Sequence, residues 1–181
     1  MAFWNRSAEM AAKLSALDKS QAIIEFLPDG TILNANANFL AAMGYRLEEI
    51  KGRHHRIFVE PAEAESGAYG LFWEKLRRGE YESREYKRLA KGGREVWIQA
   101  SYNPVPGRDG KPSKIVKFAT DITGQKLASA DAMGQIHAIG KSQAVIHFNL
   151  DGTIIEANQN FLSALGYGLE EIKGKHHRVF V

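Results

Sequence analysis

The chain has 181 residues, of which 44% are hydrophobic and 25% charged, and its formal net charge is +3. These values are ordinary for a globular protein, and no run approaches the ~18–20 apolar residues that a membrane span requires. The absence of cysteine excludes disulfides, thiolate metal sites, covalent haem attachment, a flavin–cysteinyl photocycle and cysteine nucleophiles.

The N-terminus lacks a signal-peptide core, so we expect a cytoplasmic protein. Basic residues are mixed with acidic ones outside two segments, KLRRGE and KRLAKGGR, which favours solvated faces over a nucleic-acid surface. Motifs for a nucleophile elbow, a phosphate-binding loop or a zinc protease are absent from the sequence. We therefore expect no enzymatic activity and no nucleic-acid partner.

Residues 3–17 have the spacing of an amphipathic helix. The apolar stripe consists of Phe3, Met10, Leu14 and Leu17. Because few neighbouring residues would cover this stripe, we expect it to pack against the following domain or a second chain. Residues 1–17 are therefore assigned as an N-terminal helix.

A hairpin and several short helices are expected next. The apolar runs 22–26 and 31–34 flank a PDG turn, which predicts two antiparallel strands. Asn34 or Asn36 can cap a helix at 37–43, and Gly44 can end it. LEEIKG at 47–52 adds one or two turns. After Pro61, a longer helix that ends at Gly79 is indicated by the spacing of Tyr69, Phe72, Trp73 and Leu76.

Three further strands are predicted at 81–89, 95–103 and 114–119, joined by turns at 91–94 and 107–112. In the middle strand, one face consists of Val96, Ile98, Ala100 and Tyr102. Strands that precede and follow a group of helices predict an α+β domain with an antiparallel sheet. The core candidates are Phe39, Leu40, Phe58, Phe72, Val96, Ile98 and Phe118.

One segment of the chain occurs twice. Residues 19–59 and 141–181 align without a gap, and about 29 of the 41 positions are identical. This period is too long for a solenoid unit, so the repeat is a domain repeat. We expect a complete domain at 18–123, a linker helix at 124–139 and a truncated second copy at 140–181. Ile136 and Ile139 of the linker correspond to Leu14 and Leu17.

The second copy carries the hairpin and short helices without the last three strands. Its apolar residues would then have no sheet to complete, and leaving one exposed forgoes ~1.5–3 kcal/mol. The residues concerned are Val145, Ile146, Phe148, Ile154, Phe161 and Leu165. We therefore expect residues 140–181, if ordered, to be held by contacts with residues 1–139 of the same or a neighbouring chain.

The order of motifs resembles the PAS family of sensor domains. The resemblance rests on DGTILNANANFLAAMGY, EEIKG, HHRIF, FWEKLRRGE, GGREVWI and KFATDIT, and it covers residues 18–123 and 140–181. Within the family, the chain is most similar to tandem PAS modules of soluble methyl-accepting chemotaxis proteins, including aerotaxis-type receptors. The resemblance implies a five-stranded antiparallel sheet with short helices on one face. It also implies a ligand cleft between sheet and helices, with output through the flanking helices.

The pair His54-His55, repeated as His176-His177, is the most chemically suggestive element, because imidazoles bind metals and titrate near neutral pH. Two adjacent side chains cannot both face one site, so at most one is a ligand. In the alternative reading, one His caps a helix and the other lies in solvent. The resemblance implies a cleft lined by His54, His55, Phe58 and Trp73. No metal site is expected, except that His54 or His55 would ligate the iron if haem is present.

The resemblance to aerotaxis receptors implies haem or FAD as candidate cofactors. Flavin-binding relatives carry an Arg-His pair where this chain has Val59-Glu60, and the axial His of haem-binding relatives falls near Val59. Both departures weaken the case for a cofactor. Three functions stay open: a sensory relay module of a chemotaxis-type receptor, a haem or flavin sensor of oxygen or redox state, and a dimerisation domain without ligand. The flanking helices predict a parallel homodimer.

Overall fold

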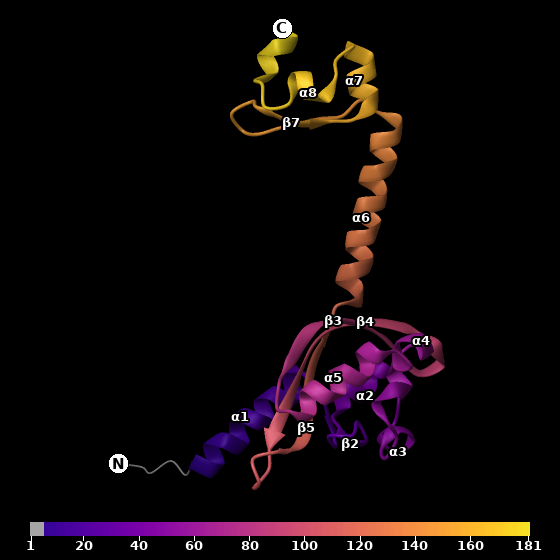
Figure 1. The fold of residues 1–181 in the computed structure, drawn as a ribbon, viewed down its shortest axis with the longest axis vertical. Coiled ribbons are helices and arrows are strands. Elements are labelled where there is room, and N and C mark those ends of the chain that lie inside the picture. The colour runs from indigo at the N-terminus through magenta and orange to yellow at the C-terminus, as the bar shows by residue number, and fades with distance from the viewer. Residues whose placement is uncertain (1–5) are drawn as a thin grey trace. The chain divides into compact units, whose positions relative to one another are not determined.

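The computed structural model describes residues 6–181, which fall into two units divided at Gly124 (Figure 1). The strands of the first unit are β1 Ala22–Phe26, β2 Ile32–Ala35, β3 Glu82–Leu89, β4 Glu95–Pro106 and β5 Pro112–Asp121. Its helices are α1 Arg6–Ser20, α2 Ala37–Met43, α3 Leu47–Ile50, η1 His55–Phe58, α4 Pro61–Ala64, α5 Gly67–Arg77 and η2 Lys91–Gly93. Helix α6, Thr123–Ser142, follows.

The five strands form one antiparallel sheet in the order β2-β1-β5-β4-β3. Helices α2 and α5 contact the strands of this sheet, and Figure 1 shows the short helices gathered within its curve. The predicted α+β class and the five-stranded antiparallel sheet are therefore confirmed.

The hairpin between β1 and β2 is closed by the predicted Pro-Asp-Gly turn. The Gly30 N–H donates to the Leu27 carbonyl at 2.9 Å, and the Thr31 N–H donates to the Asp29 carboxylate at 2.9 Å. Gly30 has a φ of +91°, and a Cβ on it would lie 2.6 Å from His54 Nε2. This position therefore requires glycine for both conformation and space.

Asn36 joins three elements. Its Oδ1 accepts the Phe39 N–H at 3.0 Å, which caps α2, and the Ile23 N–H of β1 at 2.9 Å. Its Nδ2 donates to the carbonyls of Asp18 and Gln21, at 3.0 and 2.8 Å. The predicted capping role is confirmed, and the same residue also fastens the end of α1 to the sheet.

The predicted alternation along β4 is confirmed, because Val96, Ile98, Ala100 and Tyr102 are all buried. Among the other core candidates, Phe39, Phe58 and Phe72 are buried, and Leu40 is half-buried at the edge of the core.

The expectation that Phe118 lies in the core is wrong. Phe118 is half-buried and lines a groove on the opposite face, and its neighbour Lys117 is buried instead. The cause is the register of β5 with β4, which places Lys117 opposite the inward-facing Tyr102 and Phe118 opposite Ser101. Because side chains alternate, the register decides which residues enter the core.

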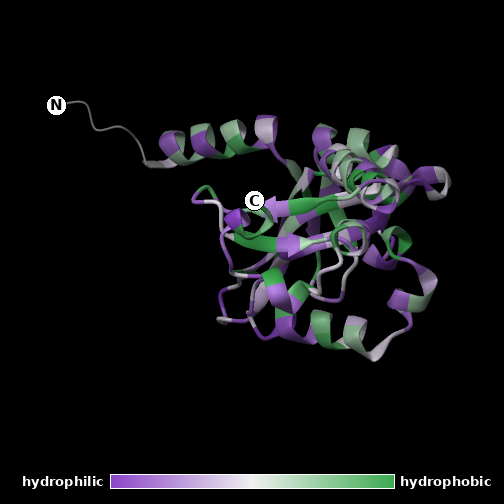
Figure 2. Cartoon of the chain, turned by 90° about the horizontal axis from the view of Figure 1, so that it is seen from above, coloured by the Kyte–Doolittle hydropathy of each residue, from purple (hydrophilic) through white to green (hydrophobic). Residues whose placement is uncertain are grey.

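Helix α1 ends at Ser20, three residues later than predicted, and Phe3 lies outside the described residues. Figure 2 shows hydrophobic and hydrophilic residues alternating along this helix. Met10, Leu14 and Leu17 are exposed. Leu14 and Leu17 line a groove of about 680 Å³ with the outer face of the sheet, where Val116 and Phe118 also lie.

The second unit contains β6 Ile146–Phe148, β7 Ile154–Ala157, α7 Gln159–Leu165, α8 Leu169–Ile172 and η3 His177–Phe180. Ile154, Ala157, Leu162 and Ile172 form its small buried cluster, whereas Phe148 and Leu165 are exposed. Ile136 and Ile139 line a groove of about 630 Å³ in this unit, at positions equivalent to Leu14 and Leu17. The coverage of its apolar residues by other parts of the protein stays a prediction. Among the described helices, none is long and apolar enough to cross a membrane.

Candidate functional site

His55 lies fully buried at the centre of the first unit. It begins the short helix η1, between the turn that holds His54 and helix α4. Six aromatic rings surround the imidazole, with centroids 5.3–6.4 Å from its own: Phe26, Phe58, Tyr69, Phe72, Trp73 and Tyr102. These rings come from the sheet and from the helices, so the site lies where the sequence resemblance implies a cleft.

Both nitrogens of His55 are engaged. Nδ1 lies 2.8 Å from the Tyr69 hydroxyl on α5, and Nε2 lies 3.0 Å from the Tyr102 hydroxyl on β4. Burial lowers the pKa of His55 well below its ordinary value, and the charges of Lys117 and Arg88 lower it further. The neutral ring donates through one nitrogen and accepts through the other, so a single imidazole joins a helix to the sheet.

His54 serves a different purpose. Its Nδ1 accepts the Arg56 N–H at 3.1 Å, which caps η1, and its ring packs against Gly30. The expectation that adjacent histidines cannot share one site agrees with this division. The alternative reading is half right: one His caps a helix, but the other is buried and not in solvent. In the second unit, His176 caps η3 in the same way, and His177 is exposed.

The interior does not accommodate haem or a flavin in this packing. To ligate iron, His55 would have to give up its hydrogen bond to Tyr69 or Tyr102. His54 accepts the Arg56 N–H through Nδ1, and its Nε2 lies against Gly30. The aromatic rings fill the space that a planar cofactor would need, because neighbouring centroids such as those of Phe72 and Tyr102 are 4.9 Å apart.

Lys117 is the least expected member of the interior. Its side chain is 1% exposed, and its Nζ lies 4.8 Å from the ring centroid of Tyr102 and 5.9 Å from that of Phe39. Within the described residues, this amine has aromatic faces but no carboxylate as neighbours. Burial lowers the pKa of Lys117 well below its ordinary value, and the Arg88 charge adds to this effect.

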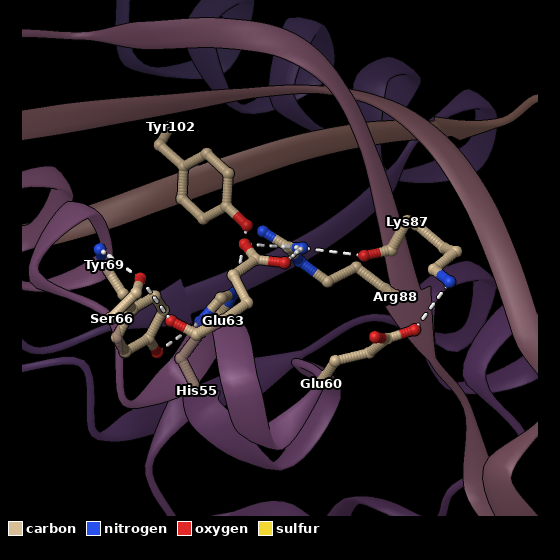
Figure 3. Close-up of polar contacts among 8 residues, drawn as sticks. All are labelled: His55, Glu60, Glu63, Ser66, Tyr69, Lys87, Arg88 and Tyr102. Atoms are coloured by element: carbon tan, nitrogen blue, oxygen red, sulfur yellow. Dashed lines mark hydrogen bonds and ion pairs between the residues drawn. The ribbon is translucent and has the colours of Figure 1, made fainter.

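A polar network leads from the surface to His55 (Figure 3). Arg88 Nη1 donates to both Glu63 carboxylate oxygens, at 3.2 and 3.3 Å. The Ser66 hydroxyl donates to the Glu63 carbonyl at 2.7 Å and accepts the Tyr69 N–H at 3.2 Å. Since Tyr69 also contacts His55, the network connects β3, α4, α5 and η1.

Three buried polar atoms lack an aligned partner: Trp73 Nε1, Tyr86 Oη and Arg88 Nε. Burial raises the pKa of Tyr69, and the nearby Trp73 N–H partly offsets this although it is not aligned for a hydrogen bond. Tyr86 and Arg88 both line a cavity of about 290 Å³ beside α5 and β3. Unsatisfied buried groups are rare in native proteins, so two of the residues that line this cavity carry an unusual unpaired polar atom.

The structure brings the predicted residues His55, Phe58 and Trp73 together, with His54 at the edge of the group. Sequence reasoning missed Lys117 and Arg88 as interior residues. The available signal was alternation, since Lys117 and Ile115 share one face, and so do Arg88 and Tyr86. Charged residues are almost never fully buried, so alternation alone does not predict that Lys117 and Arg88 lie in the interior.

The order of the strands, the helices on one face and the buried polar site define a PAS sensor domain. Family models agree: a model described as PAS fold matches residues 32–119, and one described as PAS domain matches residues 142–181. The chain belongs to the PAS family, as its motifs predict.

Two curated relatives are a biofilm dispersion protein and an aerotaxis receptor. The biofilm dispersion protein BdlA of Pseudomonas aeruginosa is 44% identical over 167 residues, which cover 92% of this chain and 40% of BdlA. The aerotaxis receptor of Escherichia coli is 29% identical over 119 residues, which cover 66% of this chain and 23% of the receptor. The chain therefore spans less than half the length of either relative.

Solved structures show the same fold. A PAS domain from Colwellia psychrerythraea has a TM-score of 0.55 at 22% identity, covering 64% of this chain and 98% of that one. A light-oxygen-voltage domain studied with a flavin analogue has a TM-score of 0.53 at 22% identity, covering 70% of this chain and 96% of that one. At these identities the likeness concerns the fold alone.

Proposed function

We propose that the chain is the PAS sensory region of a cytoplasmic chemotaxis-type receptor, in which the state of the interior is relayed to the flanking helices. The relay uses strand β4. Tyr102 of this strand contacts the buried His55, and Trp97 of the same strand holds the start of α6, because its N–H donates to the Thr123 hydroxyl at 2.9 Å. The Ile122 N–H donates to the Trp97 carbonyl at 2.8 Å. This double attachment is the observation that carries the proposal.

Hydrogen bonds hold both ends of the relay in a defined geometry. At the interior end, two hydroxyls fix the His55 ring. At the output end, the Asp121 carboxylate accepts the Thr123 N–H at 2.8 Å, which adds a third bond at the start of α6. A change at Tyr102 that shifts β4 would therefore alter the first turn of α6 through contiguous hydrogen bonds.

Hydrogen exchange on the full chain tests this relay. Tyr102→Phe should change exchange at the amides of residues 121–127, and Thr123→Val should do so directly by removing the attachment to Trp97. Tyr81→Phe, at a hydroxyl on a side chain that is 73% exposed, is the matched control. If Thr123→Val alters α6 while Tyr102→Phe leaves it unchanged, the interior is not coupled to the helix and the proposal fails.

An absorbance spectrum of the purified chain addresses the alternative of a haem or flavin sensor. We expect neither a Soret band nor flavin absorption, because the interior is filled by side chains. Either signal would show that the chain senses through a bound cofactor and not through a small ligand.

A further inference from the structure

The buried polar or charged side chains of the first unit all belong to basic residues. Among the described residues, the buried polar or charged side chains are His55, Arg88 and Lys117, and no carboxylate is buried with them. A cation inside a protein is costly unless it is paired. Lys117 can lose its proton, but a guanidinium cannot, so Arg88 requires an anion at every pH at which the domain is folded.

The anion that Arg88 has in this structure comes from the rim of the domain. The side chain of Glu63 is 41% exposed, whereas that of Arg88 is 3% exposed. Glu63 contacts only Nη1 of the guanidinium, and Arg88 Nε stays buried without a partner. Glu63 is thus an incomplete and accessible counterion, which can move into water while Arg88 cannot.

The cavity beside Arg88 has the lining of a small binding site. The guanidinium is held over the Tyr86 ring, with Cζ 4.6 Å from its centroid, and the Tyr86 hydroxyl is buried without an aligned partner, although Arg84 lies over the same ring. Tyr69 and Phe72 supply apolar rings. At about 290 Å³, the cavity is at the lower end of the range for small-molecule sites.

We propose that this cavity binds a small organic anion whose carboxylate takes the place of Glu63 on Arg88. A carboxylate is the class indicated, because the protein already places one there and because two donors, Arg88 Nε and Tyr86 Oη, remain available to it. The apolar part of the ligand lies against Tyr69 and Phe72. This inference rests on the proposed sensory function and names the class of its stimulus.

Displacement of the Glu63 side chain would affect the relay that runs from His55 through β4 to α6. The Glu63 carbonyl is tied to the Ser66 hydroxyl, which caps α5 at Tyr69, and Tyr69 contacts His55. Release of the Glu63 side chain therefore acts on the short helix α4 and on the start of α5. Binding and relay remain separable, since binding requires Arg88 and the relay requires Tyr102 and Thr123.

Calorimetric titration of the full chain with sodium benzoate and sodium propionate tests the proposal, at constant ionic strength, with sodium phosphate as the comparison anion. We expect the carboxylates to bind and phosphate to bind at least about tenfold more weakly, because phosphate has no apolar part to lie against Tyr69 and Phe72. Arg88→Gln should abolish binding, whereas Arg78→Gln, at an exposed pair with Glu80, should leave it unchanged. Binding retained in Arg88→Gln would overturn the proposal, as would phosphate binding of equal strength.

Glu63→Gln gives the sharper result, and it does not depend on a substitution in the core. Removing the internal competitor should tighten carboxylate binding by about fivefold, the factor expected for loss of a weak ion pair. Glu65→Gln, at an exposed residue just after α4, is the matched control. Unchanged or weaker binding in Glu63→Gln would refute the displacement. If Arg88→Gln fails to fold by circular dichroism, the Glu63 comparison decides the matter alone.

Discussion

Lys117 shows how a single side chain can link the stability of this domain to pH. Its folded-state pKa is lowered by burial and by Arg88, whereas the unfolded chain keeps the ordinary value near 10.5. Between these two values the unfolded state binds more protons than the folded state. Stability therefore rises with pH across this window and falls as pH drops through it, by up to about 1.4 kcal/mol per pH unit.

Replacing Lys117 with Met removes this linkage. We expect Lys117→Met to be more stable than the wild type at pH 7 by about 1–3 kcal/mol, because an unpaired amine that is costly to bury is exchanged for an apolar side chain of similar length. The rise of stability with pH below 10.5 should also become flatter. Urea unfolding at several pH values measures both effects, with Lys111→Met in an exposed turn as the control. A less stable Lys117→Met protein would show that the amine has a bonding role in the folded state.

The hydroxyl of Tyr69 should contribute to the stability of the folded domain. Tyr69→Phe leaves His55 Nδ1 buried without its partner at 2.8 Å, which should cost about 1–3 kcal/mol of unfolding free energy. Tyr45→Phe, at a half-buried tyrosine on the edge of the core, is a suitable comparison. Equal stability of wild type and Tyr69→Phe, measured by urea titration, would mean that the His55 contact contributes nothing.

The identities of the interior residues could be predicted only in part from the sequence. The aromatic residues at Tyr69, Phe72 and Trp73 have a helical spacing that needs no tertiary information. His55 could be named from its motif, but its burial depends on two hydroxyls 14 and 47 residues away. The burial of Lys117 depends on the register between β4 and β5, which the sequence does not specify by itself.

At the scale of elements, short-range chemistry made the turns and caps predictable. The Pro-Asp-Gly turn, the Asn36 cap and the Gly44 C-cap each depend on residues within a few positions. The end of α1 could not be placed as well. The Asn36 amide that holds the carbonyls of Asp18 and Gln21 lies well beyond the helix itself.

The prediction of a homodimer rests on helix α1 and on the groove that it lines with the outer face of the sheet. Leu14 is 57% exposed and Leu17 is 42% exposed, beside an apolar outer sheet face. Leu14→Asp with Leu17→Asp would place charges in an apolar interface, so we expect the double variant to be monomeric. Light scattering at high micromolar concentration measures the outcome.

The matched control for the dimer is Ala8→Asp with Ala12→Asp, which lie on the opposite side of the same helix. This control should remain dimeric. A wild-type protein that is monomeric under the same conditions would contradict the prediction directly.

At the scale of the whole molecule, the two units differ in how completely they bury their apolar residues. The first unit has a large continuous core, and the second has a cluster of four buried residues. Limited proteolysis of the full chain tests whether the apolar residues of the second unit are covered. If residues 140–181 are held by contacts with residues 1–139 of the same or a neighbouring chain, they should resist cleavage. Rapid loss of these residues after cleavage between Thr123 and Lys141, with the first unit intact, would show that they are not covered.

The repeat preserves the residues that join the helix before the hairpin to the sheet. Both copies carry the turn glycine, the capping asparagine and the doubled histidine, and Asn158 holds the carbonyls of Gly140 and Gln143 as Asn36 holds those before β1. In the first copy, both hydroxyls that hold His55 come from residues beyond these shared positions, Tyr69 and Tyr102. Local residues thus build the joint between helix and sheet, whereas residues 60–122 complete the interior around the histidine. Substitutions at residues 60–122 can therefore alter what the interior accepts while that joint stays unchanged.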